Sequence, residues 1–244
     1  MITVKNLIKI YKVGSDKVVA LNDVSFTVEE GEICCILGTS GSGKSTLLNM
    51  LAGLEKPTRG EIIIGGQHIE LMSEKRITRF RQKNVGFVFQ SYNLLHGLTA
   101  LENVAMPLTF RGVNRKKREK IAFLMLAMVG LSKRIRHKPT QMSGGQQQRV
   151  GIARAFAARP KIVFADEPTG NLDTRTTIEV MELMVALSRS NNQTLIVVTH
   201  EKDIADYADR IIKLSDGQIV SDERKTGRET ELHKQDIREL ERVQ

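Results

Sequence analysis

Residues 33–45 have the sequence ICCILGTSGSGKS, and this stretch decides the fold. An apolar segment leads into Gly38-Thr-Ser-Gly-Ser-Gly-Lys-Ser45, which fits the pattern G-x-x-x-x-G-K-[ST]. The glycines let the backbone wrap around a phosphate so that several amide N–H groups point inward. The amphipathic segment that follows predicts a helix ending near Gly53, and its N-terminus adds a partial positive charge. The sequence therefore predicts a strand, a phosphate-binding loop and a helix, in that order.

A second segment supplies the acids that such a loop needs. Within the pattern, Lys44 is expected to bridge the β- and γ-phosphates of a nucleotide, and Ser45 is expected to ligate Mg²⁺. Residues 162–167, IVFADE, predict a hydrophobic strand that ends at Asp166, where a carboxylate can hold the Mg²⁺ shell. Glu167 can polarise a water for in-line attack on the γ-phosphorus. Many acids at strand ends are only caps, but together with the loop this pair indicates nucleoside triphosphate hydrolysis.

The composition is that of an ordinary globular protein. The chain has 244 residues, a hydrophobic share of 41% and a charged share of 27%, which exclude disorder and a fibrous repeat. No stretch approaches the roughly 18 apolar residues of a membrane span, and the longest apolar run, 121–131, predicts a buried helix. The two cysteines, Cys34 and Cys35, are neighbours on a predicted strand and point to opposite faces, which excludes a disulfide framework. Because no signal-peptide pattern precedes them, we expect a soluble intracellular protein in a reducing compartment.

The net charge of +9 is concentrated in one segment. Residues 111–138 carry one acid, Glu119, and ten basic residues: Arg111, Arg115, Lys116, Lys117, Arg118, Lys120, Lys133, Arg134, Arg136 and Lys138. Such a run is most often a solvated helix face. It would also suit anionic lipid headgroups or an acidic partner. A nucleic-acid surface is less favoured, because aromatic residues make up 5% of the chain and tryptophan is absent.

The order of predicted elements indicates an α/β protein. Strands are expected within residues 2–11 and 23–37, at 61–64, 85–89, 161–165 and 194–199, and a helix is expected at 176–189. Residues 100–158 are expected to be helical throughout, with a third helix opening near Ser143. Long apolar strands flanked by helices favour a mostly parallel sheet, with a helical subdomain at about 91–160 inserted in the core. We expect one domain over 1–220 and a charged extension, helical or frayed, over 221–244.

A third motif narrows the class. Met142-Ser-Gly-Gly-Gln-Gln-Gln-Arg149 resembles the signature motif of ABC ATPases, with Met142 in place of the usual leucine. Ser143 alone would be an ordinary helix N-cap. However, Gln90 resembles the family's Q-loop glutamine, Gly170-Asn-Leu-Asp173 resembles its D-loop, and His200 resembles its switch histidine. Tyr11 stands where the family stacks an aromatic ring on adenine, and the resemblance spans about residues 1–220 in the family's order.

The resemblance implies a fold, two cofactors and a set of site residues. The fold is a P-loop NTPase of the ABC type, with an N-terminal antiparallel β part beside the mostly parallel sheet. The implied cofactors are ATP and Mg²⁺, and Mg²⁺ would be held by Ser45, Gln90 and, through water, Asp166. The implied ATP-binding residues are Tyr11, Gly38, Thr39, Ser40, Gly41, Ser42, Gly43, Lys44, Ser45 and Thr46.

The resemblance also implies a mechanism in which two copies close head to tail on ATP. Each ATP would then lie between the loop at 38–46 of one copy and the signature residues of the other: Ser143, Gly144, Gly145 and Gln146. Glu167 would be the general base, and His200 would contact the γ-phosphate. Gln90 would sense Mg²⁺ and the attacking water, and Asp173 would couple the two sites.

Two further stretches resemble one bacterial group within the family. Residues 89–104 and 165–173 are similar to lipoprotein-releasing, macrolide-efflux and antimicrobial-peptide-resistance transporters, and to the division-associated ATPase. This implies a separate transmembrane permease, efflux or force transmission in the envelope, and a peripheral position at the cytoplasmic face of the bacterial plasma membrane. The alternatives are an amino-acid importer, a division-associated subunit that regulates or scaffolds, and a soluble non-transport ABC ATPase. We expect no nucleic-acid partner.

Overall fold

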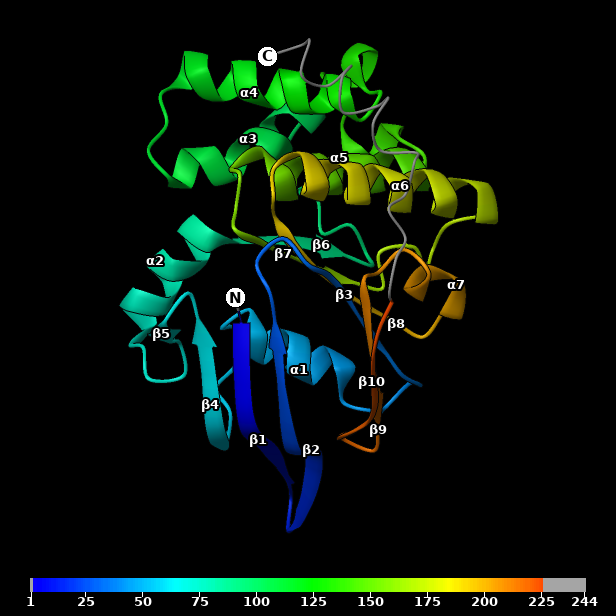
Figure 1. The fold of residues 1–244 in the computed structure, drawn as a ribbon. Helices are drawn as coiled ribbons and strands as arrows, with labels where there is room; N and C mark the ends of the chain where they lie inside the picture. Colours follow the sequence, from blue (N-terminus) through cyan, green and yellow to red (C-terminus); the bar gives the residue numbers. More distant parts are fainter. Residues whose placement is uncertain (1, 226–244) are drawn as a thin grey trace. The chain divides into compact units, whose positions relative to one another are not determined.

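The computed structural model describes residues 2–225, which form two compact units (Figure 1). Unit 1 comprises the described residues up to Arg81 together with those from Thr194 onward, and unit 2 comprises Gln82–Gln193. Over residues 2–225, every helix is too short or too polar to cross a bilayer.

Unit 1 contains an antiparallel sheet. Its strands are β1 (Ile2–Val13), β2 (Asp16–Val28), β4 (Arg59–Ile64) and β5 (Gln67–His68), in the order β2-β1-β4-β5. Near the start of β1, Ile2, Val4 and Leu7 are buried, as the alternating sequence predicts. The predicted strand at 2–11 and the antiparallel N-terminal part are confirmed by this sheet.

Unit 1 also contains a second layer, whose central strands are parallel and whose outermost strand is antiparallel and mostly exposed. Its strands are β3 (Ile33–Leu37), β8 (Thr194–Thr199), β9 (Arg210–Ser215) and β10 (Gln218–Arg224), in the order β10-β9-β3-β8. β3 runs parallel to both β8 and β9, and every residue of β3 and β8 is buried, Cys34 and Cys35 included. Helix α1 (Lys44–Leu51) follows β3 through the glycine-rich loop, and the short helix α7 (Lys202–Ala205) follows β8.

Unit 2 combines two parallel strands with a helical layer. β6 (Val85–Phe89) pairs in parallel with β7 (Ile162–Asp166), and β6 is preceded by helix α2 (Glu74–Asn84), most of which belongs to unit 1. The helices are α3 (Ala100–Phe110), α4 (Arg115–Met128), α5 (Gly144–Ala157) and α6 (Thr174–Ser190). The first three pack on one another around buried apolar side chains such as Val104, Leu126 and Val150 (Figure 1). Thr99 and Glu102 form a capping box that begins α3.

Three expectations about local structure were wrong in part. Residues 100–158 are not helical throughout, because 3₁₀ turns at Ser132–Arg134 and Pro139–Gln141 separate α4 from α5. The predicted extension starts too early, because residues 221–224 belong to β10 and pair with β9; residues 226–244 lie outside the described residues. The run 121–131 does not form a fully buried helix, since Phe123 is 42% exposed.

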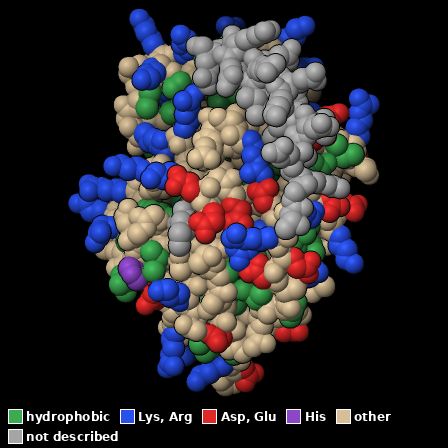
Figure 2. Space-filling view, viewed as in Figure 1, with side chains coloured by type: hydrophobic (Ala, Val, Ile, Leu, Met, Phe, Trp, Pro, Cys, Tyr) green, Lys and Arg blue, Asp and Glu red, His purple; other side chains and the backbone are tan. Residues whose placement is uncertain are grey.

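The basic segment 111–138 falls on several elements of unit 2. Arg111 follows α3, five basic residues lie in the first six positions of α4, and the other four lie in the turns beyond it. In Figure 2, Lys and Arg side chains gather with hydrophobic ones at the top of the view, where Figure 1 draws α4.

Candidate nucleotide-binding site

The phosphate loop connects β3 to α1 in unit 1. Gly43 is the N-cap of α1, has φ = 98°, and offers no side chain to cap the helix. The carbonyl oxygen of Thr39 accepts hydrogen bonds from the backbone N–H of Ser42 at 3.3 Å and from Nζ of Lys44 at 2.8 Å. These two bonds fold the loop back on itself. The start of α1 therefore presents its amide dipole without a competing side-chain acceptor, as a phosphate site requires.

Packing explains two glycines of the loop. A Cβ on Gly43 would lie 2.4 Å from the carbonyl oxygen of Ala20 in β2. A Cβ on Gly38 would lie 2.4 Å from the carbonyl oxygen of Leu214 in β9. Gly41 differs, because it has φ = 81° but a Cβ there would meet nothing within 4 Å. Gly38 and Gly43 are therefore required by close backbone approach, and Gly41 only by its left-handed conformation.

The polar side chains of the loop fit a triphosphate. Lys44 is buried, and its amine is held inside the loop. Ser42 Oγ is also buried and has no hydrogen-bond partner among the described residues. Ser45 is exposed on the first turn of α1, and its hydroxyl is an oxygen ligand of the kind that Mg²⁺ prefers. A cationic amine, an uncapped helix start and an orphaned hydroxyl together form a donor set suited to a polyanion.

Tyr11 lies within β1, which continues to Val13, and its hydroxyl is already engaged. Tyr11 Oη donates to Glu55 Oε2 at 2.7 Å, and Lys9 Nζ lies 2.8 Å from the same carboxylate and 5.0 Å from the centre of the Tyr11 ring. Burial and the bond to Glu55 raise the pKa of Tyr11. Burial alone would raise the pKa of Glu55, but the bonds from Lys9 and Tyr11 outweigh it and hold that pKa below its ordinary value. The ring that the sequence assigned to adenine is therefore fixed by its neighbours.

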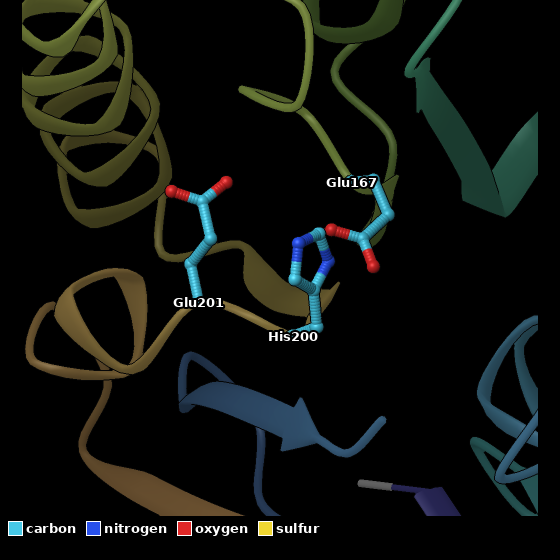
Figure 3. Close-up of side chains that lie close together, drawn as sticks. All are labelled: Glu167, His200 and Glu201. Carbon is cyan, nitrogen blue, oxygen red and sulfur yellow. The ribbon is translucent and has the colours of Figure 1, made fainter. Parts of the chain in front are cut away.

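The position of His200 follows from strand register. β3 and β8 run in parallel with Leu37 beside Thr199, and the N–H of Gly38 donates to the carbonyl oxygen of Thr199 at 3.3 Å. His200 is the next residue and is exposed. Unit 1 therefore brings His200 to the edge of the sheet from which the phosphate loop leaves. Figure 3 draws His200 and Glu201 at this end of β8.

In unit 2, strand register places the predicted base beside the predicted Q-loop glutamine. Phe89 pairs with Asp166, so Gln90 and Glu167 leave the ends of β6 and β7 as neighbours. Glu167, drawn at the end of β7 in Figure 3, has φ = 44°, a left-handed conformation that costs a non-glycine residue about 1–2 kcal/mol. This turn changes the direction of the chain directly after Asp166.

The loop after β7 holds Gln90 and begins α6. Nδ2 of Asn171 donates to the carbonyl oxygen of Gln90 at 3.1 Å, and a Cβ on Gly170 would lie 2.8 Å from Gln90 Nε2. Asp173 is the N-cap of α6, where it accepts from the N–H of Thr176 at 3.0 Å and from the Thr176 hydroxyl at 2.7 Å. These bonds hold the pKa of Asp173 below its ordinary value. The predicted D-loop aspartate is therefore a helix cap within one chain.

The signature segment forms the start of α5. Ser143 is the N-cap and makes a capping box with Gln146, in which each side chain accepts from the backbone N–H of the other. A Cβ on Gly144 would lie 2.8 Å from Tyr92 Oη, and a Cβ on Gly145 would lie 2.7 Å from Thr176 Cγ2. The two glycines therefore let other side chains approach the start of α5 closely.

Two residues of α5 that sequence analysis missed connect this helix to the site loops. Gln148 is fully buried and its Nε2 donates to the carbonyl oxygen of Pro168 at 2.5 Å. Arg154 is buried and donates to the carbonyl oxygens of Asn93 at 2.5 Å and Tyr92 at 2.9 Å. Burial lowers the pKa of Arg154. The sequence offered one signal for these two contacts: a glutamine and an arginine stand among the small and apolar residues of a helix that faces the core.

The structure divides the predicted site residues between the two units. Unit 1 holds Tyr11, Gly38, Thr39, Ser40, Gly41, Ser42, Gly43, Lys44, Ser45, Thr46 and His200. Unit 2 holds Gln90, Ser143, Gly144, Gly145, Gln146, Asp166, Glu167 and Asp173. Within unit 1, the pairing of β3 with β8 places the phosphate loop and His200 at the same end of the two strands. Within unit 2, the pairing of β6 with β7 places Gln90 beside Asp166 and Glu167.

Comparisons with known proteins agree with this geometry. The family model described as ABC transporter matches residues 21–170. The chain is 44% identical over 222 residues to the lipoprotein-releasing system ATP-binding protein LolD of Geobacter metallireducens, covering 91% of this chain and 99% of LolD. It is 44% identical over 226 residues to the macrolide export ATP-binding/permease protein MacB of Shewanella sp., covering 93% of this chain but 35% of MacB.

A solved structure agrees as well. The dimeric post-hydrolysis structure of the ATP-binding cassette MJ0796 of Methanocaldococcus jannaschii, bound to ADP and Pi, superposes with a TM-score of 0.86 at 43% identity, covering 93% of this chain and all of that one. The fold class is therefore confirmed as an α/β P-loop ATPase. The chain belongs to the ABC transporter family. Within it, the chain is an ATP-binding ATPase similar to LolD and to the cassette of MacB.

Proposed function

We propose that this chain hydrolyses ATP as an Mg²⁺-dependent homodimer and thereby drives a conformational change in a separate bacterial permease. The observation that carries the proposal is the uncapped, glycine-lined start of α1 with the buried Lys44 beside it. The transport class is supported by the relatives, which are named for lipoprotein release and macrolide export. On this proposal the chain works peripherally at the cytoplasmic face of the plasma membrane, in efflux or in mechanical work on the envelope.

The phosphate loop binds the triphosphate, and Tyr11 stacks on the adenine. Lys44 neutralises charge on the β- and γ-phosphates, and the start of α1 adds its dipole. Ser45, Gln90 and, through water, Asp166 are oxygen donors that would hold Mg²⁺, which supplies charge neutralisation for the leaving diphosphate. The hydrogen bond from Tyr11 to Glu55 supports the proposed stacking on adenine, because it restrains the orientation of the Tyr11 ring.

Glu167 acts as the general base. Its carboxylate takes the proton of a water whose oxygen attacks the γ-phosphorus, while the bond to the β-phosphate oxygen breaks and ADP leaves. The pairing of Phe89 with Asp166 supports this role, since it sets Gln90 beside Glu167, where the amide can orient the same water. His200 contacts the γ-phosphate, and its place beside the phosphate loop at the edge of unit 1 supports that contact.

The signature residues Ser143–Gln146 complete the site of a second copy. The relative MJ0796 is dimeric in its ADP- and Pi-bound structure, which supports this arrangement. ATP then holds two helix starts around one polyanion, and hydrolysis releases them. Asp173 couples the two sites, and its place at the cap of α6, next to the Asn171–Gln90 contact, supports this role.

A groove on the helical part of unit 2 receives the permease. It has a volume of about 420 Å³ and is lined by α3, α4 and the turn before α3. Leu98, Leu101 and Ala105 make one wall apolar, while Glu102 and Arg115 add charge. An amphipathic helix from the cytoplasmic side of a permease has the matching chemistry. The groove lies on elements that follow Gln90 in the chain.

The variant Glu167→Gln tests the catalytic part of the proposal. We expect ATP turnover to fall by roughly 100-fold or more, because a general base contributes about 10²–10⁴-fold. The variant should also accumulate as an ATP-bound dimer on size exclusion. Glu182→Gln on the exposed face of α6 is the matched control and should keep wild-type turnover. Near-normal turnover in Glu167→Gln would show that another group takes the proton.

The same trapped variant tests the partner. Tagged Glu167→Gln protein is mixed with ATP and detergent-solubilised membranes, and the co-purifying proteins are identified. We expect a membrane protein with few helices and a large outer domain. A many-helix permease would favour conventional import or export instead. Recovery of ribosomal or nucleic-acid components without a membrane protein would contradict the transport function and leave the ATPase assignment standing.

A further inference from the structure

Helix α4 begins with an unusual run of charge. Its first six residues, Arg115–Lys120, contain five basic side chains and one acid, and its first turn holds no acid. The N-cap is the neutral Asn114, which accepts from the N–H of Lys117. Cations at a helix N-terminus oppose the helix dipole, so this arrangement raises the free energy of the helix. Helix stability therefore does not explain why the charge is there.

The arginines of this region are committed to internal contacts. Arg111 donates to the carbonyl oxygens of Gln82 at 2.5 Å and Lys83 at 2.8 Å, which ties the end of α3 to the end of α2. Arg115 pairs with Glu119 at 2.8 Å. Arg118 donates to the carbonyl oxygen of Val113 at 3.2 Å, next to the N-cap of α4. Arg111 therefore links two helix ends, whereas Arg115 makes only an exposed i,i+4 pair.

The lysines of α4 are different. Lys116, Lys117 and Lys120 are exposed, and none of them forms an ion pair with another residue that the structure describes. Three cationic amines thus lie on the outer face of one helix without an anionic partner in residues 2–225. A solvated face alone would account for the lysines, so the decisive question is what else lies on that face.

The outer face also carries apolar side chains. At 100° per residue, Lys116, Lys120, Phe123 and Ala127 form one exposed stripe along α4, and the exposed Lys117 and the half-buried Leu124 lie along one side of it. Phe123 is 42% exposed although the buried side of the same helix holds Ala122 and Leu126. The stripe is therefore basic in its first half and apolar in its second half. Figure 2 shows basic and hydrophobic side chains next to one another at the top of the view.

We propose that the outer face of α4 binds the anionic headgroups of a phospholipid bilayer. Lys116, Lys117 and Lys120 contact phosphate-bearing headgroups, and Phe123 enters the boundary between headgroups and acyl chains. Lysines near an anionic surface are attracted to its headgroups, and an exposed aromatic ring beside them can enter the headgroup boundary. The anionic surface also relieves the unfavourable charge at the start of α4. The contact is made by this chain itself and does not depend on which permease it serves.

Vesicle flotation of the purified full chain tests the proposal. Vesicles of phosphatidylcholine mixed with phosphatidylglycerol are compared with vesicles of phosphatidylcholine alone, at low and at high salt. Wild-type protein should float with the anionic vesicles only, and less at high salt. Replacing Lys116, Lys117 and Lys120 by Gln should weaken binding on the order of 100-fold, because each lysine near an anionic surface contributes about fivefold. Phe123→Ser should weaken binding at both salt concentrations.

A matched control removes the same charge elsewhere in the segment. Lys133, Arg136 and Lys138 are exposed and lie beyond α4, and their replacement by Gln should leave most vesicle binding intact. Equal losses in both triple variants would overturn the proposal in favour of non-specific charge attraction. Failure of wild-type protein to float with the anionic vesicles would overturn it as well. ATP turnover is measured on every variant and should not change, so failure here is distinguishable from failure of the proposed ATPase cycle.

Discussion

Two helix starts that we propose to face the phosphates of ATP are built in opposite ways. The start of α1 is shaped by backbone packing: Gly43 has no capping side chain and lies against the carbonyl of Ala20. The start of α5 is shaped by side chains: Ser143 and Gln146 cap each other. Both ends offer the partial positive charge that attracts phosphate. The first is left open for a ligand, while the second already satisfies part of its own hydrogen bonding.

The difference suits the two helix starts to different parts of the proposed binding cycle. An uncapped helix start leaves its N–H groups to water or to a ligand, which suits the α1 end to the phosphate binding that we propose. A capped start is stable without a ligand, which suits the α5 end to the proposed contact with the nucleotide of a second copy. This comparison can be tested by breaking each end in turn.

The largest effect is expected from Gly43→Ala. The new Cβ would overlap the carbonyl oxygen of Ala20 at 2.4 Å, in a backbone already at φ = 98°, so the loop must move and ATP-analogue binding should be lost. Gly41→Ala is the matched control, since it has φ = 81° but no neighbour within 4 Å. It should lose only about 1–2 kcal/mol of stability from backbone strain. Titration with a fluorescent ATP analogue and urea unfolding measure the two effects; equal affinity losses would show that packing at Ala20 is irrelevant.

The next largest effect is expected from Arg154→Met, which removes the hydrogen bonds from α5 to the loop at Tyr92 and Asn93. The carbonyl groups of Tyr92 and Asn93 would lose a charged donor in a partly buried place, at a cost of about 1.5–3 kcal/mol in the free energy of unfolding. Arg149→Met is the control, because its ion pair with Glu179 is partly exposed and contributes at most about 1 kcal/mol. Urea denaturation compares them. A similar loss in both variants would argue against a special role for the Arg154 contacts.

A smaller effect separates the two roles of Ser143. Ser143→Ala removes the cap and should cost about 1 kcal/mol of stability, whereas Ser143→Gly should cost only a few tenths. Both variants lack the hydroxyl, so both should weaken ATP-dependent dimerisation of a Glu167→Gln background to the same extent. Thermal unfolding and size exclusion give the two readouts. If Ser143→Ala weakens dimerisation more than Ser143→Gly does, in parallel with its larger loss of stability, Ser143 acts only as a cap.

The smallest effect is a pH dependence at Glu55. The pKa of Glu55 lies below its ordinary value near 4.5, so its ionised form stabilises the fold above that value, and the contribution is lost as the pH falls through the lower folded-state pKa. Glu55→Gln should therefore be less stable than wild type at pH 7 by less than about 1 kcal/mol, since the pair with Lys9 is partly exposed. This difference in stability between Glu55→Gln and wild type should disappear in strong acid, where Glu55 is protonated. Urea unfolding across the acid range measures it, and a gap that widens in acid would contradict the assignment.

Local patterns in the sequence predicted most of the elements that position the site. The strands at 85–89 and 194–199 were predicted with the bounds that β6 and β8 have. The strand–loop–helix order around Lys44 was predicted as well, because a glycine pattern and the period of apolar residues are both local properties. β9, β10 and α2 were missed. Their sequences carry mixed polar residues, and tertiary pairing decides the two strands, since β9 pairs with the distant β3 and β10 pairs with β9.

The sequence by itself determined the chemistry of this protein: a phosphate loop, an acid pair at a strand end and a signature segment, each encoded within a few neighbouring residues. Only the tertiary structure decided which side chains hold those parts in place. Arg154 meets carbonyl groups about 60 positions away, and Gln148 meets Pro168 across the loop after β7. It also decided that Phe123 faces outward from a run that reads as buried. The physical reason is that burial and hydrogen-bond partners depend on packing between elements, which local periodicity does not encode.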